Sequence, residues 1–422
     1  MDKKESALWD VAVIGGGPAG MMAAGRAAEN GTRVVLLEKN AGLGKKLLIT
    51  GGGRCNVTNA ESDNKKLLAK FRESGKFLSS PFSRWSVRES LDFFHSRGMD
   101  TKEEAERRVF PVSNTARSVW ETLAQYVQKN GVTVMSRAPV VGLVSEAGVV
   151  TGAQIRGGEI IRARSFILAT GGTSHPETGS TGDGYAWLRA LGHTVHEASA
   201  ALVPVALKTP AKSAAGVAIQ NAKVTLLQNE VKQSQLSGKI LFTHVGLSGP
   251  CILNMSRDIG ELLKYGEVVI EIDLLSDMGY EKVNAALQEI FKANSNKKIK
   301  NSLKGLLPPA LVPYILQTAQ IDAETFCNSV TRDARVRLIK RLKHLRFEAK
   351  GLLGLHKAVI TAGGVALTEV DFKTMRSLKY SNLFLIGDIL DINRPSGGYS
   401  LQLCWTTGYV AGSAAAEYIS TF

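Results

Sequence analysis

Residues 10–39 read DVAVIGGGPAGMMAAGRAAENGTRVVLLEK, and this stretch decides the fold of the chain. Residues 11–14 form a short apolar run of the kind found in a buried parallel strand. Residues 21–29 are small and helix-compatible, Asn30-Gly31 ends that segment, and residues 32–37 give a second apolar run. The order strand, glycine turn, helix and strand predicts a βαβ unit.

The turn after the first predicted strand has the G-x-G-x-x-G spacing of a dinucleotide-binding fold. Gly15 permits a tight turn, Gly17 lets a pyrophosphate approach the backbone, and Gly20 lets the helix pack closely on the strand. The helix N-terminus then faces the phosphates with its positive dipole end. Glu38 can accept hydrogen bonds from both ribose hydroxyls, and its charge would repel a 2′-phosphate. The expected contacts here are Gly15, Gly17, Pro18, Ala19, Gly20, Glu38 and Lys39.

The composition is that of a globular protein with two or three domains: 422 residues, 44% hydrophobic and 21% charged. The four cysteines show no C-x-x-C pair and no metal-ligand spacing, which argues for a reducing compartment and against a metal site. We find no apolar run of about 18 residues and no signal-peptide pattern, so we expect a cytoplasmic protein without a membrane partner. The net charge of +14 favours polyanionic partners.

The pattern of elements changes along the chain and predicts a discontinuous α/β domain. Residues 1–193 carry the βαβ unit, residues 194–276 alternate short strands with turns, and residues 277–350 are typical of helices. Residues 351–422 return to the first pattern and end in a small-residue helix over 402–418. We expect a Rossmann-like dinucleotide-binding domain in two parts, with an inserted β-barrel-like domain and a small helical domain between them.

Glycine-containing segments also follow later strands. Thr170-Gly171 and Gly387-Asp388 each follow a buried apolar run, at the edge where open α/β sheets bind ligands. Gly398 precedes the final helix, whose N-terminal dipole suits a reduced flavin ring. Because a simple NAD dehydrogenase has no use for these later motifs, the sequence favours FAD. Further expected FAD contacts are Lys46, Gly53, Arg54, Cys55, Asn56, Val140, Thr170, Gly171, Gly387, Asp388, Gly398 and Leu401.

Together these motifs resemble the BaiN/RdsA family of NAD(P)/FAD-dependent oxidoreductases, also called aminoacetone-oxidase-like flavoproteins. The matching stretches span the chain in order: residues 10–24, 46–59, 108–113, 169–172, 178–185, 241–250, 361–365 and 397–402. The chain departs from the family pattern at residues 392–395 (INRP) and at Ser400, where relatives usually carry an Asp-Gly pair and Asn. Ligand contacts over the flavin are therefore expected to differ.

The resemblance implies an FAD domain with an inserted β-barrel and a helical cap, in which NADH or NADPH reduces FAD and the flavin reduces a conjugated C=C bond. Members of the family are associated with bile-acid enone reduction and with dihydrouridine formation in ribosomal RNA. We expect a uridine of 23S ribosomal RNA as substrate. The alternatives are a small-molecule enone or other metabolite, and a non-catalytic FAD-containing RNA-binding protein. The choice of nicotinamide and the oligomeric state stay open.

Four residues are candidates for catalysis. Cys55, in the glycine loop, could donate a proton, although a packed thiol is the plainer interpretation. Arg54 could neutralise negative charge on flavin or substrate, or contact the pyrophosphate. His244 could act as an acid or substrate ligand, against a structural histidine. Tyr399 could donate a proton or stack on a ring, against simple packing.

Residues 331–350 predict a basic amphipathic helix whose apolar stripe consists of Val336, Ile339, Leu342 and Leu345. The density of positive charge favours contact with ribosomal RNA phosphates, and the alternative is a solvated basic face. The basic residues of the predicted helical domain are Lys297, Lys298, Lys300, Lys304, Arg332, Arg335, Arg337, Lys340, Arg341, Lys343, Arg346 and Lys350.

Overall fold

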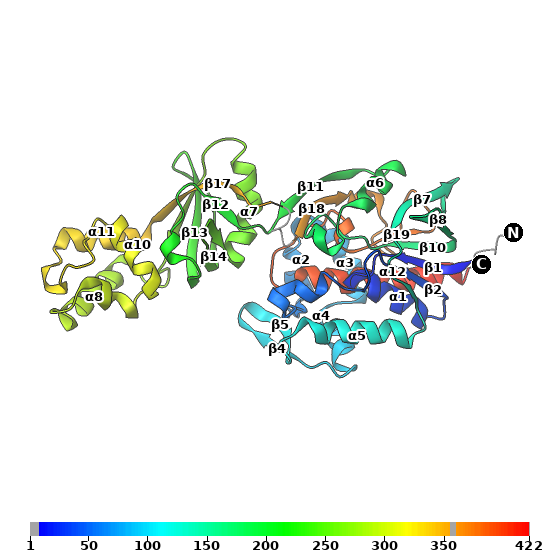
Figure 1. Ribbon diagram of the computed structural model, residues 1–422, viewed down its shortest axis with the longest axis horizontal. Helices are drawn as coiled ribbons and strands as arrows, with labels where there is room; N and C mark the ends of the chain where they lie inside the picture. Colours follow the sequence, from blue (N-terminus) through cyan, green and yellow to red (C-terminus); the bar gives the residue numbers. More distant parts are fainter. Residues whose placement is uncertain (1–7, 355–359, 422) are drawn as a thin grey trace. The chain divides into compact units, whose positions relative to one another are not determined.

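The computed structural model describes residues 8–354 and 360–421, which form two compact units (Figure 1). The first unit combines the chain up to Ala200 with the chain after Ala358, and the second unit is the segment between them. The predicted fold class, a discontinuous α/β domain with an inserted barrel and helices, is confirmed.

A five-stranded parallel sheet forms the centre of the first unit. The strand order is β19 (Leu383–Leu385), β10 (Ala163–Leu168), β1 (Trp9–Ile14), β2 (Val34–Leu37) and β6 (Thr133–Met135). Val11, Ala12 and Val13 are fully buried, as expected for a strand covered on both faces. Because all five strands are parallel, their carboxyl ends meet at one edge of the sheet.

The first and last helices of the chain, α1 (Pro18–Glu29) and α12 (Tyr399–Ile419), pack against each other with almost no space between their backbones. A Cβ atom added at Gly408 or Gly412 would lie 2.6 or 2.5 Å from a carbonyl oxygen of α1. Only glycine permits such an approach. This contact joins the two ends of the sequence into one hydrophobic core, and it explains why the domain is discontinuous.

Further elements surround this core. The helices are α2 (Asn64–Ala69), α3 (Gly75–Arg84), α4 (Val87–His95), α5 (Ala116–Lys129) and α6 (Asp183–Ala190). The strands are β3 (Thr58–Asn59), β4 (Thr101–Glu104), β5 (Arg108–Pro111), β7 (Val140–Glu146), β8 (Val149–Ile155), β9 (Ile160–Ile161), β11 (Val195–Ala201) and β18 (Ile360–Val365). Among the described residues, no helix combines the length and apolar character needed to cross a membrane.

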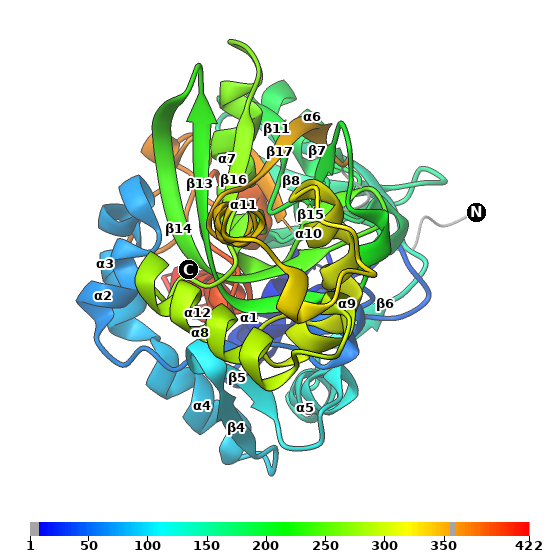
Figure 2. The same ribbon diagram turned by 90° about the vertical axis from the view of Figure 1, so that its left-hand side faces the viewer.

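The second unit is a closed barrel with helices attached (Figure 2). The barrel strands are, in spatial order, β12 (Val205–Leu207), β15 (Gly246–Ser248), β14 (Val231–Phe242), β13 (Ala218–Gln228), β16 (Val269–Asp273) and β17 (Leu345–Leu352). The helices are α7 (Pro250–Leu262), α8 (Tyr280–Ala293), α9 (Ile299–Ser302), α10 (Val312–Thr318) and α11 (Arg332–Lys343). Barrel and helices share one hydrophobic core.

The basic helix predicted over residues 331–350 is wrong in its last third. Helix α11 ends at Lys343, and Arg346 and Lys350 belong to strand β17, which closes the barrel between β12 and β16. Val336, assigned to the apolar stripe, is 53% exposed. The nonlocal pairing of β17 overrides the helical periodicity that continues through this segment.

Glu369 connects the two sequence segments of the first unit. Its carboxylate accepts a hydrogen bond from the Thr194 amide at 2.9 Å and lies 2.9 Å from His193 Nδ1 and 3.0 Å from Lys379 Nζ. Although burial opposes ionisation, the hydrogen bonds from Lys379, Thr194 and His193 lower the pKa of Glu369 to about 2. The carboxylate therefore stays ionised at every pH at which the protein works.

Replacing Glu369 by glutamine is expected to lower the free energy of unfolding by about 1 kcal/mol at neutral pH, a figure reduced for solvent screening. Because the pKa is about 2 in the folded protein against an ordinary 4.5, the stabilisation is complete above 4.5 and is lost as the pH falls towards 2. Urea unfolding of wild type and Glu369→Gln at several pH values measures the difference, with the exposed Glu146→Gln as control. A difference that stayed constant down to about pH 2 would contradict this assignment.

Candidate functional site

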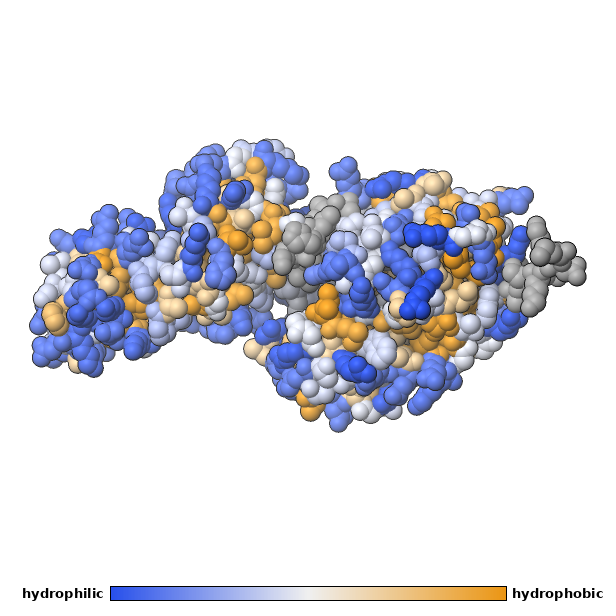
Figure 3. All heavy atoms as spheres, in the orientation of Figure 1, coloured by the Kyte–Doolittle hydropathy of each residue, from blue (hydrophilic) through white to orange (hydrophobic). Residues whose placement is uncertain are grey.

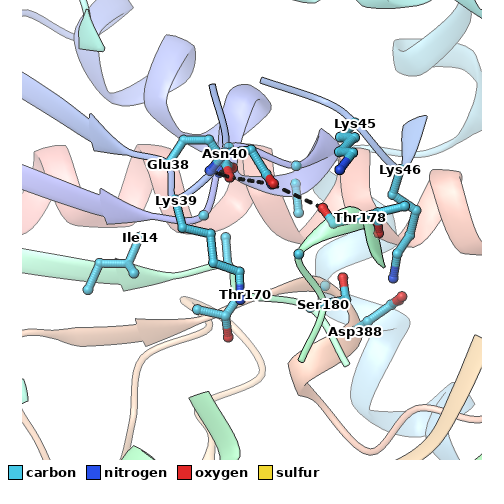
Figure 4. A pocket seen from close by; sticks show the side chains of 18 of the residues that line it. Ile14, Glu38, Lys39, Asn40, Lys45, Lys46, Thr170, Thr178, Ser180 and Asp388 are labelled. Carbon is cyan, nitrogen blue, oxygen red and sulfur yellow. Dashed lines mark hydrogen bonds between the residues drawn. The ribbon is translucent and has the colours of Figure 1, made fainter. Parts of the chain in front are cut away.

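A pocket lies at the carboxyl edge of the parallel sheet, where open α/β sheets bind ligands (Figure 4). Its wall contains residues 14–19 after β1, Glu38 after β2, residues 169–171 after β10 and residues 386–388 after β19. These segments are far apart in the sequence, and the parallel strands bring them to one place. Of the predicted cofactor contacts, the structure gathers Gly15, Gly17, Pro18, Ala19, Glu38, Lys39, Lys46, Val140, Thr170, Gly171, Gly387 and Asp388 in this wall.

The three glycines of the turn have different surroundings. Gly15 has φ +107°, and a Cβ there would lie 2.4 Å from the Ala169 carbonyl oxygen. A Cβ at Gly20 would lie 1.9 Å from the carbonyl oxygen of Gly15, so Gly20 packs against the turn behind the pocket wall. A Cβ at Gly17 would meet no protein atom within 4 Å. The first two glycines allow the protein to pack, whereas the space beside Gly17 is left to a ligand.

Glu38 is buried in the pocket wall and holds the turn. Its Oε2 accepts a hydrogen bond from the Gly16 amide at 2.9 Å, and its Oε1 accepts from the backbone and side-chain nitrogens of Asn40 at 2.7 and 2.8 Å. A carboxylate offers about four acceptor positions, so about one remains for a ribose hydroxyl. The sequence did not point to Asn40, because nothing local in its pattern indicates this hydrogen bond.

Two loops close one side of the pocket. Lys39 Nζ lies 2.8 Å from Asp183 Oδ2 and 2.6 Å from Thr181 Oγ1, and Asn40 Nδ2 donates to the Thr178 carbonyl oxygen at 3.0 Å (Figure 4). The ammonium group of Lys39, predicted as a cofactor contact, is thus engaged by the protein itself. Its role in this structure is to join the loop after β2 to the start of α6.

A charged cluster borders another part of the wall. Lys46 Nζ donates to Ser174 Oγ at 3.2 Å, and burial lowers the pKa of Lys46, an effect that the nearby Asp388 opposes. Asp388 is also paired with Arg394, a buried residue whose Nε donates to Ser400 Oγ at 3.0 Å. Two cations beside one carboxylate leave net positive charge at the wall, which suits an anionic ligand. Arg394 was not predicted as a site residue, although it lies in the segment that departs from the family pattern.

The pocket residues also fit a cofactor by an independent criterion. The hydroxyl oxygen of Thr170, which lines the pocket, and the side-chain oxygen of Asn56 are both buried without a hydrogen-bond partner. Buried polar atoms are rarely left unpaired, so a ligand with a donor group is expected at Thr170. With the open space at Gly17 and the α1 N-terminus, the residues present fit a dinucleotide such as FAD.

The predicted residues Gly53, Arg54, Cys55, Asn56, Gly398, Tyr399 and Leu401 lie in the first unit but do not line this pocket. The thiol of Cys55 is fully buried, and burial raises its pKa to about 12. Tyr399 is 7% exposed and packs edge-on against Phe71, with ring centroids 5.9 Å apart; burial raises its pKa. Both side chains therefore remain protonated at neutral pH.

The other two candidate catalytic residues are also outside the pocket wall. Arg54 forms an ion pair with Glu104 and lies over the ring of Phe110, 4.2 Å from the centroid. His244 belongs to the second unit, on the exposed turn between β14 and β15. Cys404 of α12, which the sequence did not suggest, does line the pocket, and burial raises the pKa of its thiol to about 12.

Comparisons with known proteins agree with this site. The chain is 33% identical to the 3-dehydro-bile acid delta(4,6)-reductase of Clostridium scindens over 96% of its length and 99% of the relative's. It is 30% identical to the ribosomal RNA dihydrouridine synthase of Escherichia coli over 95% of its length and 96% of the relative's. Both relatives have activities that the BaiN/RdsA resemblance implied, and that resemblance is confirmed.

Solved structures show the same fold. The open conformation of a flavocytochrome c3 fumarate reductase is similar with a TM-score of 0.56 at 17% identity, covering 99% of this chain and 79% of that one. The 3-ketosteroid-delta4-(5alpha)-dehydrogenase of Rhodococcus jostii RHA1 is similar with a TM-score of 0.54 at 16% identity, covering 98% of both chains. The model described as the HI0933-like protein Rossmann domain matches residues 9–414. The chain therefore belongs to the HI0933-like family of Rossmann-domain proteins.

Proposed function

We propose that the protein is an FAD-dependent oxidoreductase of the cytoplasm that converts a uridine of 23S ribosomal RNA to dihydrouridine, with NADH or NADPH as reductant. The observation that carries the proposal is the likeness, over nearly the whole chain, to the ribosomal RNA dihydrouridine synthases of Escherichia coli and Haemophilus influenzae. The pocket at the sheet edge supports it, because its glycine turn and unpaired threonine hydroxyl fit a dinucleotide.

Bound FAD supplies the hydride that goes to C6 of the uracil ring, while a proton goes to C5. The residues of this chain have distinct tasks towards that group. The N-terminus of α1 binds the pyrophosphate, Glu38 accepts from the adenosine ribose, and the Lys46–Asp388–Arg394 cluster places positive charge beside the cofactor. Tyr399 and Cys55 are proton donors in this proposal because both hold their protons at neutral pH.

The choice of RNA as substrate is supported by the distribution of charge. The segment from Ala201 to Ala358 contains 22 Lys and Arg residues against 13 Asp and Glu, an excess of nine out of the +14 of the whole chain. Figure 3 shows mainly hydrophilic side chains over the helical end of this unit. Such a surface attracts the phosphates of ribosomal RNA, so we assign RNA binding to the second unit.

A second candidate function is the reduction of a small-molecule enone. It is favoured by the 33% identity to the bile-acid reductase of Clostridium scindens, which is no lower than the identity to the RNA-modifying relatives. In that case the basic surface of the second unit would have no part in turnover. Activity insensitive to salt would then be expected, since no phosphate contacts are made.

The test is to incubate the purified protein, FAD and NADH or NADPH with 23S ribosomal RNA from cells that lack the gene. We expect one uridine to gain two mass units, and we expect the same change to be missing from the RNA of the deletion strain. The Gly17→Ala variant serves as the cofactor-free control. Reduction of the flavin without any change in the RNA would favour the enone reductase, and a flavin that neither nicotinamide reduces would indicate a non-catalytic protein.

A further inference from the structure

A groove of about 500 Å³ lies on the outer face of the barrel in the second unit. Strands β13, β14 and β16 form its floor, and the start of α8 and the end of α11 form its sides. Val224 and Leu226 of β13 are fully buried in the barrel core, so the alternate residues Lys223 and Thr225 point outwards into the groove. A cavity of this size is large enough for one nucleotide.

An exposed aromatic side chain borders the groove and is held in a fixed position. Tyr280 is 52% exposed, and its hydroxyl donates to His344 Nε2. The other ring nitrogen of His344 lies 2.9 Å from Glu271 Oε1, and Arg346 Nε donates to Glu271 Oε2 at 2.8 Å. Although burial opposes it, the hydrogen bonds from His344 and Arg346 lower the pKa of Glu271. This chain of bonds fixes the Tyr280 ring while leaving much of it open to solvent.

The charges in the groove are not balanced. The carboxylate of Asp273 is neutralised by Lys343, whose Nζ lies 2.6 Å away. Lys232 donates only to the neutral side chain of Gln235, at 2.7 Å. Lys223 has neither an ion pair nor a hydrogen bond with any part of the chain that the structure describes. Two ammonium groups beside a rigid aromatic ring are therefore available to an anionic partner.

The basic helix α11 is less available than its sequence predicts. The Nε atoms of Arg337 and Arg341 donate to the carbonyl oxygens of Ala319 and Thr318, both at 3.0 Å. These arginines cap the end of α10, where cations stabilise free carbonyl groups. Much of the positive charge on α11 therefore serves the fold, and the groove offers the better-prepared contact.

We infer that this groove binds a nucleotide of single-stranded ribosomal RNA, with the base against Tyr280 and the flanking phosphates at Lys223 and Lys232. The inference rests on the proposed function. Single-stranded RNA is recognised by stacking of unpaired bases on aromatic side chains, and lysines follow its backbone. The groove anchors the RNA beside the nucleotide that reacts, so it sets affinity rather than chemistry.

The experiment measures binding of fluorescent single-stranded fragments of 23S ribosomal RNA to the FAD-loaded protein by anisotropy, at several salt concentrations. Tyr280→Leu should lower the affinity by at least about tenfold, and Tyr280→Phe, which keeps the ring, should stay close to wild type. Lys223→Gln with Lys232→Gln should flatten the plot of log affinity against log salt by about two units. Lys292→Gln with Lys297→Gln removes the same charge outside the groove and is the matched control.

Thermal midpoints and FAD content show whether each variant is folded. If the wild-type protein neither binds the RNA nor forms dihydrouridine, the proposed function fails, and this inference fails with it. If the wild-type protein does both and Tyr280→Leu binds equally well, the groove assignment alone is overturned. Equal loss in the groove variants and in the Lys292/Lys297 control would also overturn it, because the effect would then be one of general charge.

Discussion

Replacing Gly17 by alanine is expected to leave the apoprotein folded and to lower its affinity for FAD by about 100-fold or more. Gly17 has φ −77°, which any residue adopts, and an added Cβ would meet no protein atom within 4 Å. The apoprotein should therefore lose no more than about 1 kcal/mol, the usual difference between glycine and alanine at a helix N-cap. The methyl group would occupy the space through which a pyrophosphate approaches the backbone.

Titration of the apoprotein with FAD, followed by flavin fluorescence, measures this affinity, and urea unfolding measures the stability. Gly20→Ala is the informative comparison, because its Cβ would lie 1.9 Å from the Gly15 carbonyl oxygen and must displace the backbone. That variant should be destabilised by about 3 kcal/mol or more, even without FAD. A Gly17→Ala protein that kept its FAD affinity would show that the pyrophosphate does not lie at this turn.

The parallel sheet and the pocket at its edge could be predicted because the decisive signals are local. Residues 11–14 and 32–37 are apolar runs separated by a glycine turn and one helix length, and no other arrangement satisfies all of these features. The glycines that follow later strands also reach the pocket, since parallel strands end at one edge. The local pattern therefore fixed both the elements and their order around the ligand.

The end of the basic helix could not be predicted, because its cause is distant in sequence. Residues 344–350 continue an acceptable helical pattern, but pairing with β12 and β16 completes the barrel and buries Leu345 and Phe347. The same limit applies to Lys343. It was assigned to an exposed basic face, and its ammonium group instead pairs with Asp273 across the fold.

The positions of the catalytic candidates are a third case. Cys55 and Tyr399 were placed near the flavin from their neighbours in sequence, and the structure buries both outside the pocket wall. A motif shows that a loop approaches a ligand, but the direction of each side chain depends on packing. Their part in protonation stays a prediction, as does that of Arg54.

Replacing Arg394 by methionine is expected to lower the free energy of unfolding of the apoprotein by about 3–5 kcal/mol. The side chains of Arg394 and Asp388 are 0% and 15% exposed, so the ion pair is shielded from water. Methionine has a similar length and leaves no large cavity. It removes the partner of a buried carboxylate and the donors to Ser400 Oγ and the Ile392 carbonyl oxygen.

Comparison with Asp388→Asn and with the double variant separates the ion pair from packing. If the pair carries the effect, the double variant should be more stable than the sum of the single losses predicts, by at least about 1 kcal/mol, because no charge is left unpaired. Arg394→Lys should fall between, since one ammonium group cannot serve Asp388, Ser400 and Ile392 together. Additive losses would mean that Arg394 acts through its volume, and that the charge at the pocket wall is not what it supplies.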